Sequence, residues 1–275
     1  MTLDNEIYLG DYDGYNAKLK ILADLAQPEI WSFGKDREEQ PYKILKNYFE
    51  HTYRRLKEED KLLISSDGEH MCMNTGLLTK FHQEIIAMMG KSSRSGSEPW
   101  YLVGFFKETD QRFRSCFYDL PKIADYTDNV RDLIFDKNLF IDLNKEHIIG
   151  DNYNRFTELG YTSEEMISYM LDAAKGVLLK KLLRNFKLAL PFYYRDKKTG
   201  NDRIQLLAPL FFPSSSVRLA LVLDKCTSEN KPYYLARTVL YVEWAYMNAR
   251  LIARPDEEWA RIMDDLDETG VEVIP

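Results

Sequence analysis

The sequence has 275 residues, of which 45% are hydrophobic and 29% are charged, so it is long enough to bury a sizeable core. Its net charge of −7 argues against a protein that coats itself with nucleic acid, because such binding depends on neutralising phosphates with Lys and Arg. The acidic N-terminus lacks the features of a secretory signal, and no stretch approaches the ~20 apolar residues that span a bilayer. We therefore expect a cytoplasmic protein with no membrane partner.

The first part of the chain predicts two helices followed by antiparallel strands. Residues 15–26 and the stretch that starts near Pro41 have apolar side chains three and four residues apart, which is typical of helices that cover a sheet. Four short strands then follow, joined by short connections. They are expected at residues 61–65, 69–73, 84–90 and 100–106.

The middle of the chain predicts short elements before a long helix. Residues 119–126 suggest a short helix, and residues 140–143 a brief strand. Thr162 and Glu165 form a capping-box pattern at the start of the long helix. One face of that helix is expected to carry Met166, Met170, Leu171, Ala174, Leu178 and Leu182.

The last part predicts a second group of strands and two more helices. Strands are expected at residues 187–194, 202–212, 217–225 and 232–238, a helix at residues 238–255, and a final helix from Pro255. Two groups of antiparallel strands, covered by helices and with one long central helix, make the fold class α+β. We expect residues 1–275 to form a single domain or two lobes, residues 1–160 and residues 161–275.

No strong catalytic or cofactor motif is found in the sequence. Phosphate-binding loops, zinc-protease motifs, nucleophile elbows and dinucleotide fingerprints are absent, and the four histidines lack metal-ligand spacing. Cys72, Cys116 and Cys226 are widely spaced, so we expect buried free thiols and no disulfide partner. No metal site and no cofactor are predicted. Basic stretches at residues 175–187 and 193–203 indicate either a solvated face or a local anion-binding face.

Three polar groups of residues are candidate sites. Asn74, Thr75 and Gly76 form a strand-end turn whose amides can point at a ligand, with Lys80 nearby. An ordinary turn explains the same residues.

The second group lies at residues 146–156. His147 and Asp151 are four residues apart, which suits an acid–base pair on one helix face, and His147 is the candidate catalytic residue. Asn152 and Arg155 are candidate ligand-binding residues. A structural cap at a loop–helix junction is the alternative.

The third group is the apolar stretch TVLYVEWAYMNARLIARP, residues 238–255. Helical geometry places Glu243, Tyr246 and Arg250 along one line, with Asn248 on the neighbouring line. Glu243 and Arg250 are expected to form a structural ion pair, because a buried charge needs a partner. An arginine held in this way also suits a phosphate or carboxylate ligand, so Tyr246, Asn248 and Arg250 are candidate ligand-binding residues.

Several segments form an ordered set, namely PEIW, MNTGLL, PWYLVGFFKETD, EHIIGDNYNRF, KLALPFYY with RIQLLAPLFF, and ARTVLYVEWAYMNARLIARPDEEW. Taken in this order, they resemble a microbial domain of unknown function, DUF3825, and the resemblance runs from about Leu22 to Trp259. The family pattern includes the Asn-Thr-Gly-Leu turn, an Ala-Tyr-x-Asn-Ala-Arg helix and an acidic residue at Glu243. Relatives fused to small predicted RNA-binding domains imply an RNA-linked or nucleotide-linked role.

The preferred hypothesis is an RNA- or nucleotide-binding module in which the candidate residues converge on one cleft. One alternative is a metal-independent phosphodiesterase or nucleotide hydrolase that uses His147. The other is a non-catalytic interaction protein whose polar helix is a buried network.

Overall fold

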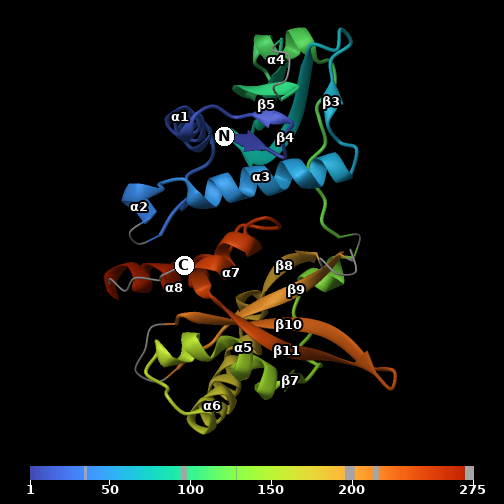
Figure 1. Cartoon of the computed structure of the whole chain (residues 1–275). Helices are drawn as coiled ribbons and strands as arrows, with labels where there is room; N and C mark the ends of the chain where they lie inside the picture. The colour runs from blue at the N-terminus through green and yellow to red at the C-terminus, as the bar shows by residue number, and fades with distance from the viewer. Residues whose placement is uncertain (34–35, 94–97, 128, 196–201, 213–216, 270–275) are drawn as a thin grey trace. The chain divides into compact units, whose positions relative to one another are not determined.

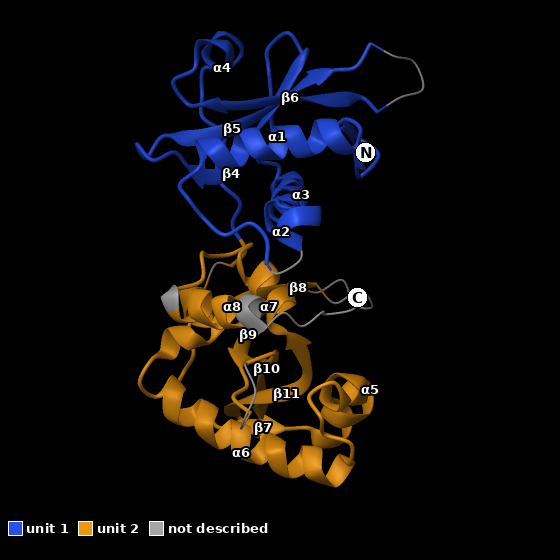
Figure 2. Cartoon of the chain, turned by 90° about the vertical axis from the view of Figure 1, so that its left-hand side faces the viewer, with its two compact units in different colours: residues 1–125 blue, residues 126–275 orange. Residues whose placement is uncertain are grey.

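The computed structural model describes residues 1–33, 36–93, 98–127, 129–195, 202–212 and 217–269. It divides into two compact units, Met1–Asp125 and Tyr126–Pro275 (Figure 2). Each unit has its own sheet and its own helices, which confirms the α+β class. That the chain forms a single domain stays a prediction.

Unit 1 is built on a six-stranded sheet with the order β1-β2-β6-β5-β4-β3. The antiparallel meander from β3 to β6 confirms the predicted strands, whereas β2 pairs with β6 in parallel. The strands are β1 (Thr2–Leu3), β2 (Ile7–Tyr8), β3 (Leu63–Ile64), β4 (His70–Leu78), β5 (Glu84–Lys91) and β6 (Trp100–Lys107). The helices are α1 (Tyr12–Leu25), α2 (Asp36–Glu39), α3 (Lys43–Glu58) and α4 (Gln111–Cys116) (Figure 1).

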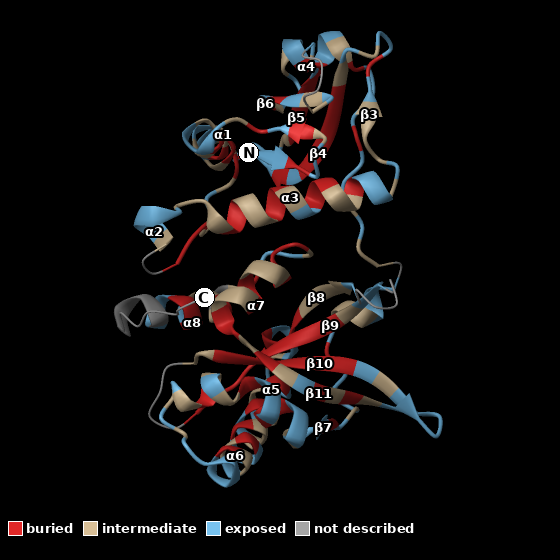
Figure 3. Ribbon diagram, in the orientation of Figure 1, coloured by how far each residue is buried: buried red, intermediate tan, exposed pale blue. Residues whose placement is uncertain are grey.

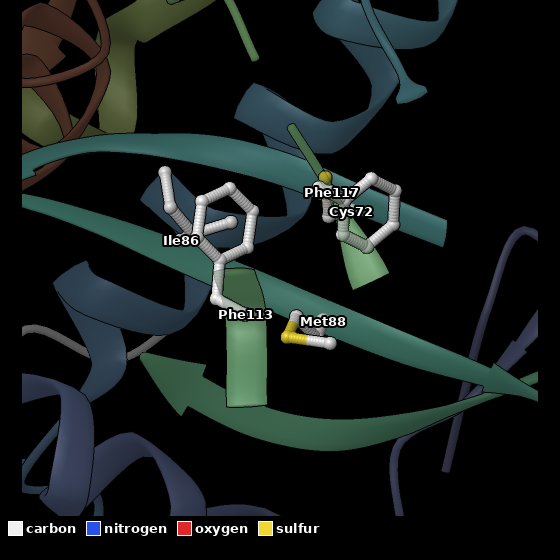
Figure 4. Packing of buried hydrophobic residues seen from close by; sticks show 5 residues of the cluster. All are labelled: Cys72, Ile86, Met88, Phe113 and Phe117. Carbon is white, nitrogen blue, oxygen red and sulfur yellow. The ribbon is translucent and has the colours of Figure 1, made fainter. Parts of the chain in front are cut away.

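Both faces of this sheet are packed, because alternate residues of a strand point to opposite sides. The buried stripe of α3 covers one face (Figure 3). There Phe49 meets Phe105 of β6 edge to face, with ring centroids 5.5 Å apart. On the opposite face, α4 contributes Phe113 to a buried cluster. The cluster consists of Cys72, Ile86, Met88, Phe113 and Phe117 (Figure 4).

The helix predicted at residues 119–126 is wrong, since this segment has no helical structure. Pro121 lies inside it, and a proline both lacks an N–H group and disfavours helical geometry in the residue before it. The helix of this region is α4, capped by Asp110, whose side chain accepts a hydrogen bond from the Arg112 amide.

Unit 2 is built on a five-stranded sheet with the order β7-β11-β10-β9-β8. The four C-terminal strands are antiparallel as predicted, and β7 pairs with β11 in parallel. The strands are β7 (Ile141–Leu143), β8 (Leu190–Arg195), β9 (Asp202–Pro209), β10 (Leu219–Ser228) and β11 (Lys231–Tyr241). The helices are α5 (Lys145–Thr157), α6 (Glu164–Leu182), α7 (Val242–Ala249) and α8 (Glu257–Thr269), with 3₁₀ turns η1 (Val130–Leu133) and η2 (Phe186–Leu188).

Two details of unit 2 differ from the sequence prediction for α6. The N-cap is Ser163 rather than Thr162, because the Ser163 side chain accepts a hydrogen bond from the Met166 amide. The predicted face includes Met166, but Met166 is exposed and the buried face contains Ile167 in its place. Strand β7 and helix α5 belong to unit 2, and a division of the chain into lobes at residue 160 stays a prediction.

The single helix predicted at residues 238–255 is also wrong. The chain continues as β11 to Tyr241, and α7 ends at Ala249. Thr238 and Val239 are β-branched, and they pair with Val222 and Leu221 of β10, so sheet pairing overrides the apolar pattern that suggested a helix.

The described residues contain no helix long and apolar enough to cross a membrane. All three cysteines carry free thiols, as predicted, but only Cys72 is buried, whereas Cys116 and Cys226 are partly exposed. Residues 196–201 of the second basic stretch lie outside the described part of the chain.

Candidate functional site

Asn152 lies at a kink in α5 and organises the site. Its backbone leaves helical geometry, with φ −129° and ψ 19°, and its side chain is buried. The Nδ2 group donates to the Ile148 carbonyl at 2.9 Å, while Oδ1 accepts from Thr238 Oγ1 at 3.3 Å and from Arg155 Nη1 at 2.6 Å. The buried amide is thereby satisfied at both ends, which fixes its position.

Arg155 is held by Asn152 and by β11. Its Nη1 group also donates to the Val239 carbonyl. The guanidinium carbon lies 5.3 Å from the ring centre of Tyr241 and 5.7 Å from that of Trp244, within cation–π range. Arg155 is only partly buried, and within the described part of the chain its Nε and Nη2 groups meet no acceptor.

Tyr241 and Trp244 are the two aromatic side chains beside Arg155. The two rings meet edge to face, with centroids 5.4 Å apart. The Tyr241 hydroxyl donates to Glu158 Oε2 at 2.7 Å, and burial followed by this hydrogen bond raises the Tyr241 pKa to about 12. The hydroxyl is therefore neutral at physiological pH, with its proton directed at the carboxylate.

The fold positions these side chains from three elements. The kinked end of α5 supplies Asn152, Arg155 and Glu158, and the end of β11 supplies Thr238 and Tyr241. Because α7 begins immediately after β11, its first turn places Trp244 beside Tyr241. We call these six residues the Arg155 site: Asn152, Arg155, Glu158, Thr238, Tyr241 and Trp244.

His147 lies on an earlier turn of α5. Its Nδ1 is 3.1 Å from Asp151 Oδ2, as the four-residue spacing predicts, and both side chains are more than half exposed. Among the described residues, the side chains that contact Arg155 do not include either of this pair. A catalytic role for His147 stays a prediction.

The predicted polar residues of α7 are placed as follows. Tyr246 is buried, and the Asn248 side chain turns back to donate to the Trp244 carbonyl at 2.8 Å. Arg250 is the C-cap residue and is buried, while Glu243 lies in the first turn. The Glu243–Arg250 ion pair and the ligand role of these residues stay predictions.

In unit 1, Asn74, Thr75 and Gly76 lie at an irregularity in β4. Asn74 Nδ2 donates to Glu84 Oε2 at 2.5 Å and to the Pro121 carbonyl at 3.0 Å, and its Oδ1 accepts from the Gly76 amide. Thr75 Oγ1 donates to the Ile85 carbonyl at 2.7 Å. These bonds account for a structural bulge.

Lys80 is exposed at the tip of the β4–β5 hairpin, with Nζ 5.2 Å from the Phe81 ring centre. The expected ligand site combines residues of both units, and it stays a prediction. The sequence predicts Asn152 and Arg155 as ligand-binding residues, but it does not predict their neighbours Glu158, Thr238, Tyr241 and Trp244. The apolar pattern of residues 238–255 predicts one helix, whereas the structure has the end of β11 and the start of α7 there.

In comparisons with known proteins, residues 22–259 match the family described as "Domain of unknown function (DUF3825)". This range includes the whole Arg155 site. No curated protein and no solved structure matches the chain.

Proposed function

We propose that this chain, which belongs to the DUF3825 family, binds a nucleotide or a nucleotide unit of RNA at the Arg155 site. The observation that carries the proposal is the set of hydrogen bonds and ring contacts that Arg155 makes. Its guanidinium is anchored through Nη1 beside two aromatic rings, while its Nε and Nη2 groups meet no acceptor among the described residues.

The unoccupied edge of the guanidinium suits a phosphate. Nε–H and Nη2–H point in the same direction, and this pair of donors binds two oxygens of a phosphate or carboxylate in parallel. Anchoring Nη1 on Asn152 and Val239 orders the side chain before a ligand arrives, so less side-chain entropy is lost on binding.

The aromatic side chain of Trp244 suits the stacking of a nucleotide base. Trp244 is only partly buried, and its ring lies close enough to Arg155 for one ligand to reach both the ring and the guanidinium. Stacking on an aromatic side chain contributes about 1–3 kcal/mol per base. The exposed Glu158 carboxylate offers an acceptor for a sugar hydroxyl or a base amino group.

The test measures binding of nucleoside monophosphates, short single-stranded RNAs and inorganic phosphate to the full chain. We expect Arg155→Ala to weaken nucleotide binding by at least about tenfold, because two charge-assisted hydrogen bonds are lost. Arg155→Lys keeps the charge without the parallel donors, so it is expected to lose affinity to a smaller extent. Arg131→Ala, at an exposed position of the same unit, is the matched control.

Trp244→Ala separates base recognition from anion binding. We expect it to weaken nucleotide binding while leaving phosphate binding unchanged. Equal affinity for phosphate and nucleotides, or nucleotide binding that survives Arg155→Ala, would overturn the proposal. Circular dichroism of each variant distinguishes a local loss from unfolding.

A further inference from the structure

Helix α6 carries a second, mostly apolar stripe besides the one that packs in the core. The buried stripe is Ile167, Leu171, Ala174, Leu178 and Leu182. The other stripe, here called the outer seam, consists of Met166, Tyr169, Ala173, Gly176, Lys180 and Leu183. In Figure 2, α6 runs along the lower side of unit 2.

The outer seam has the spacing of a coiled coil. Its residues are alternately three and four positions apart, which is the a/d pattern of a heptad repeat. Leu183 keeps right-handed helical angles, so the pattern continues through the C-cap. Three of its large apolar side chains lie in solvent, with exposed fractions of 48% for Met166, 65% for Tyr169 and 60% for Leu183.

The centre of the seam permits close approach of another helix. Ala173 is exposed, and a Cβ atom added at Gly176 would meet no heavy atom within 4 Å. The seam therefore has only small residues, Ala173 and Gly176, on two adjacent turns. The large residues Tyr169 and Lys180 lie on either side of them. A second helix with its own small residues at the same level would fit there.

The charges of α6 fix the orientation of such a partner. Glu164 and Glu165 lie in the first turn of α6, whereas Lys180 lies in its last turn and Arg184 follows its C-cap residue. An antiparallel copy brings the acidic turn of each helix alongside the basic end of the other, and it also aligns the helix dipoles favourably. A parallel copy would bring like charges together.

We propose that the outer seam is a homodimer interface in which two copies of α6 pack antiparallel about a two-fold axis. With the axis between Ala173 and Gly176, Met166 of one copy lies opposite Leu183 of the other, and Tyr169 lies opposite Lys180. Ala173 then lies opposite Gly176. Every seam position thus meets a complementary one, as a two-fold interface requires.

The flanks of the seam agree with this arrangement. Val177, which is 41% exposed, would lie at the level of Asp172 of the other copy, where its methyl groups extend the apolar contact. The Asp172 charge is balanced by Lys145, whose Nζ lies 2.5 Å from Oδ2. A helix of 19 residues is about 28 Å long, so the interface is small and a micromolar dissociation constant is expected.

Sedimentation of the full chain over a range of concentrations tests the dimer. The wild-type chain is expected to shift from monomer to dimer as concentration rises, and Met166→Glu with Leu183→Glu to remain monomeric. Both positions are exposed in the single chain, so folding is retained. Ile134→Glu, which places the same charge at a 46% exposed apolar position of unit 2, is the control and should still dimerise.

Disulfide trapping tests the orientation, with Cys116 and Cys226 replaced by Ser. Met166→Cys protein mixed with Leu183→Cys protein should form the mixed disulfide, because these positions lie opposite each other only in the antiparallel pair. Disulfides formed within each protein alone would indicate a parallel pair and overturn the proposal. A wild-type chain that stays monomeric at every concentration, or dimers unaffected by the seam variants, would also overturn it.

Discussion

Arg155 Nη1 donates a 2.6 Å hydrogen bond to Oδ1 of Asn152, three residues earlier on the same kinked helix. The bond joins a buried amide to a partly exposed guanidinium. The Asn152 side chain also accepts a hydrogen bond from the Thr238 hydroxyl and donates one to the Ile148 carbonyl. One buried side chain therefore determines both the shape of α5 and the position of the candidate binding group.

Replacing Asn152 by Ala should reduce stability and binding together. The Ile148 carbonyl and Thr238 hydroxyl lose partners, so we expect the free energy of unfolding to fall by about 1–3 kcal/mol in chemical denaturation. Nucleotide affinity should fall because Arg155 is no longer ordered. Asn154→Ala, at an exposed position of the same helix, is the control, and equal effects of the two changes would contradict this account.

Replacing Gly76 by Ala should cost more stability than replacing Gly68 by Ala. Both glycines have φ +71°, so the backbone strain of about 1–2 kcal/mol is common to the two variants. A Cβ atom at Gly76 would lie 2.6 Å from the Tyr48 hydroxyl oxygen, whereas at Gly68 nothing lies within 4 Å. The difference between their unfolding free energies measures the clash, and it should shrink when Tyr48→Phe is added. Equal costs would show that Tyr48 moves aside freely.

Tyr241 should ionise late in an alkaline titration. Its pKa is raised from 10 to about 12 by burial and then by the hydrogen bond to Glu158. Between pH 10 and about pH 12, Tyr241 keeps its proton in the folded chain and loses it in the unfolded chain. The contribution of Tyr241 to the free energy of unfolding is therefore complete below pH 10, and it is lost as the pH rises towards 12.

The measurement is the tyrosinate absorbance of the wild-type chain minus that of Tyr241→Phe. Glu158→Gln removes a charge that opposes ionisation, so the Tyr241 midpoint should move to lower pH. Glu164→Gln changes an exposed carboxylate of another helix and should leave the midpoint unchanged. A midpoint near pH 10 in the wild-type chain would contradict the expectation.

Cys72 should resist thiol reagents while the chain is folded. It is fully buried, and burial raises its pKa from 9 to about 12, so about a thousandfold less thiolate is present at neutral pH than for an ordinary thiol. Cys116 and Cys226 are only partly buried and should be alkylated first in a timed experiment followed by mass spectrometry. Alkylation of Cys72 should follow the rate of unfolding, and labelling as fast as that of Cys116 would show that the cluster opens.

Most strands and the main helices were predictable because their patterns are long and regular. The α3 helix buries the residues that its spacing selects, and β4, β5 and β6 follow the predicted meander. Short elements were not predictable in this way. The six-residue α4 buries only Phe113, which gives no periodic signal.

The Arg155 site was predicted in part, for a related reason. Asn152 and Arg155 stood out as polar residues in a short stretch of sequence, whereas their partners come from β11 and α7. An apolar run such as TVLY fits a buried strand or a buried helix equally well by pattern alone. The decisive fact is the pairing of Tyr241 with Leu219 of β10, which no local pattern contains.

The parallel pairing of β7 with β11 also sets an order of events during synthesis. Ile141 pairs with Tyr234, and the Asn144 amide donates to the Ala236 carbonyl, so β7 and α5 leave the ribosome long before the strand that receives them. Contacts this distant in sequence form slowly and late. Until β11 is made, the apolar side of α5 has no sheet to cover. A chain whose synthesis stalls before β11 would therefore expose the apolar side of α5 to chaperones or to other nascent chains.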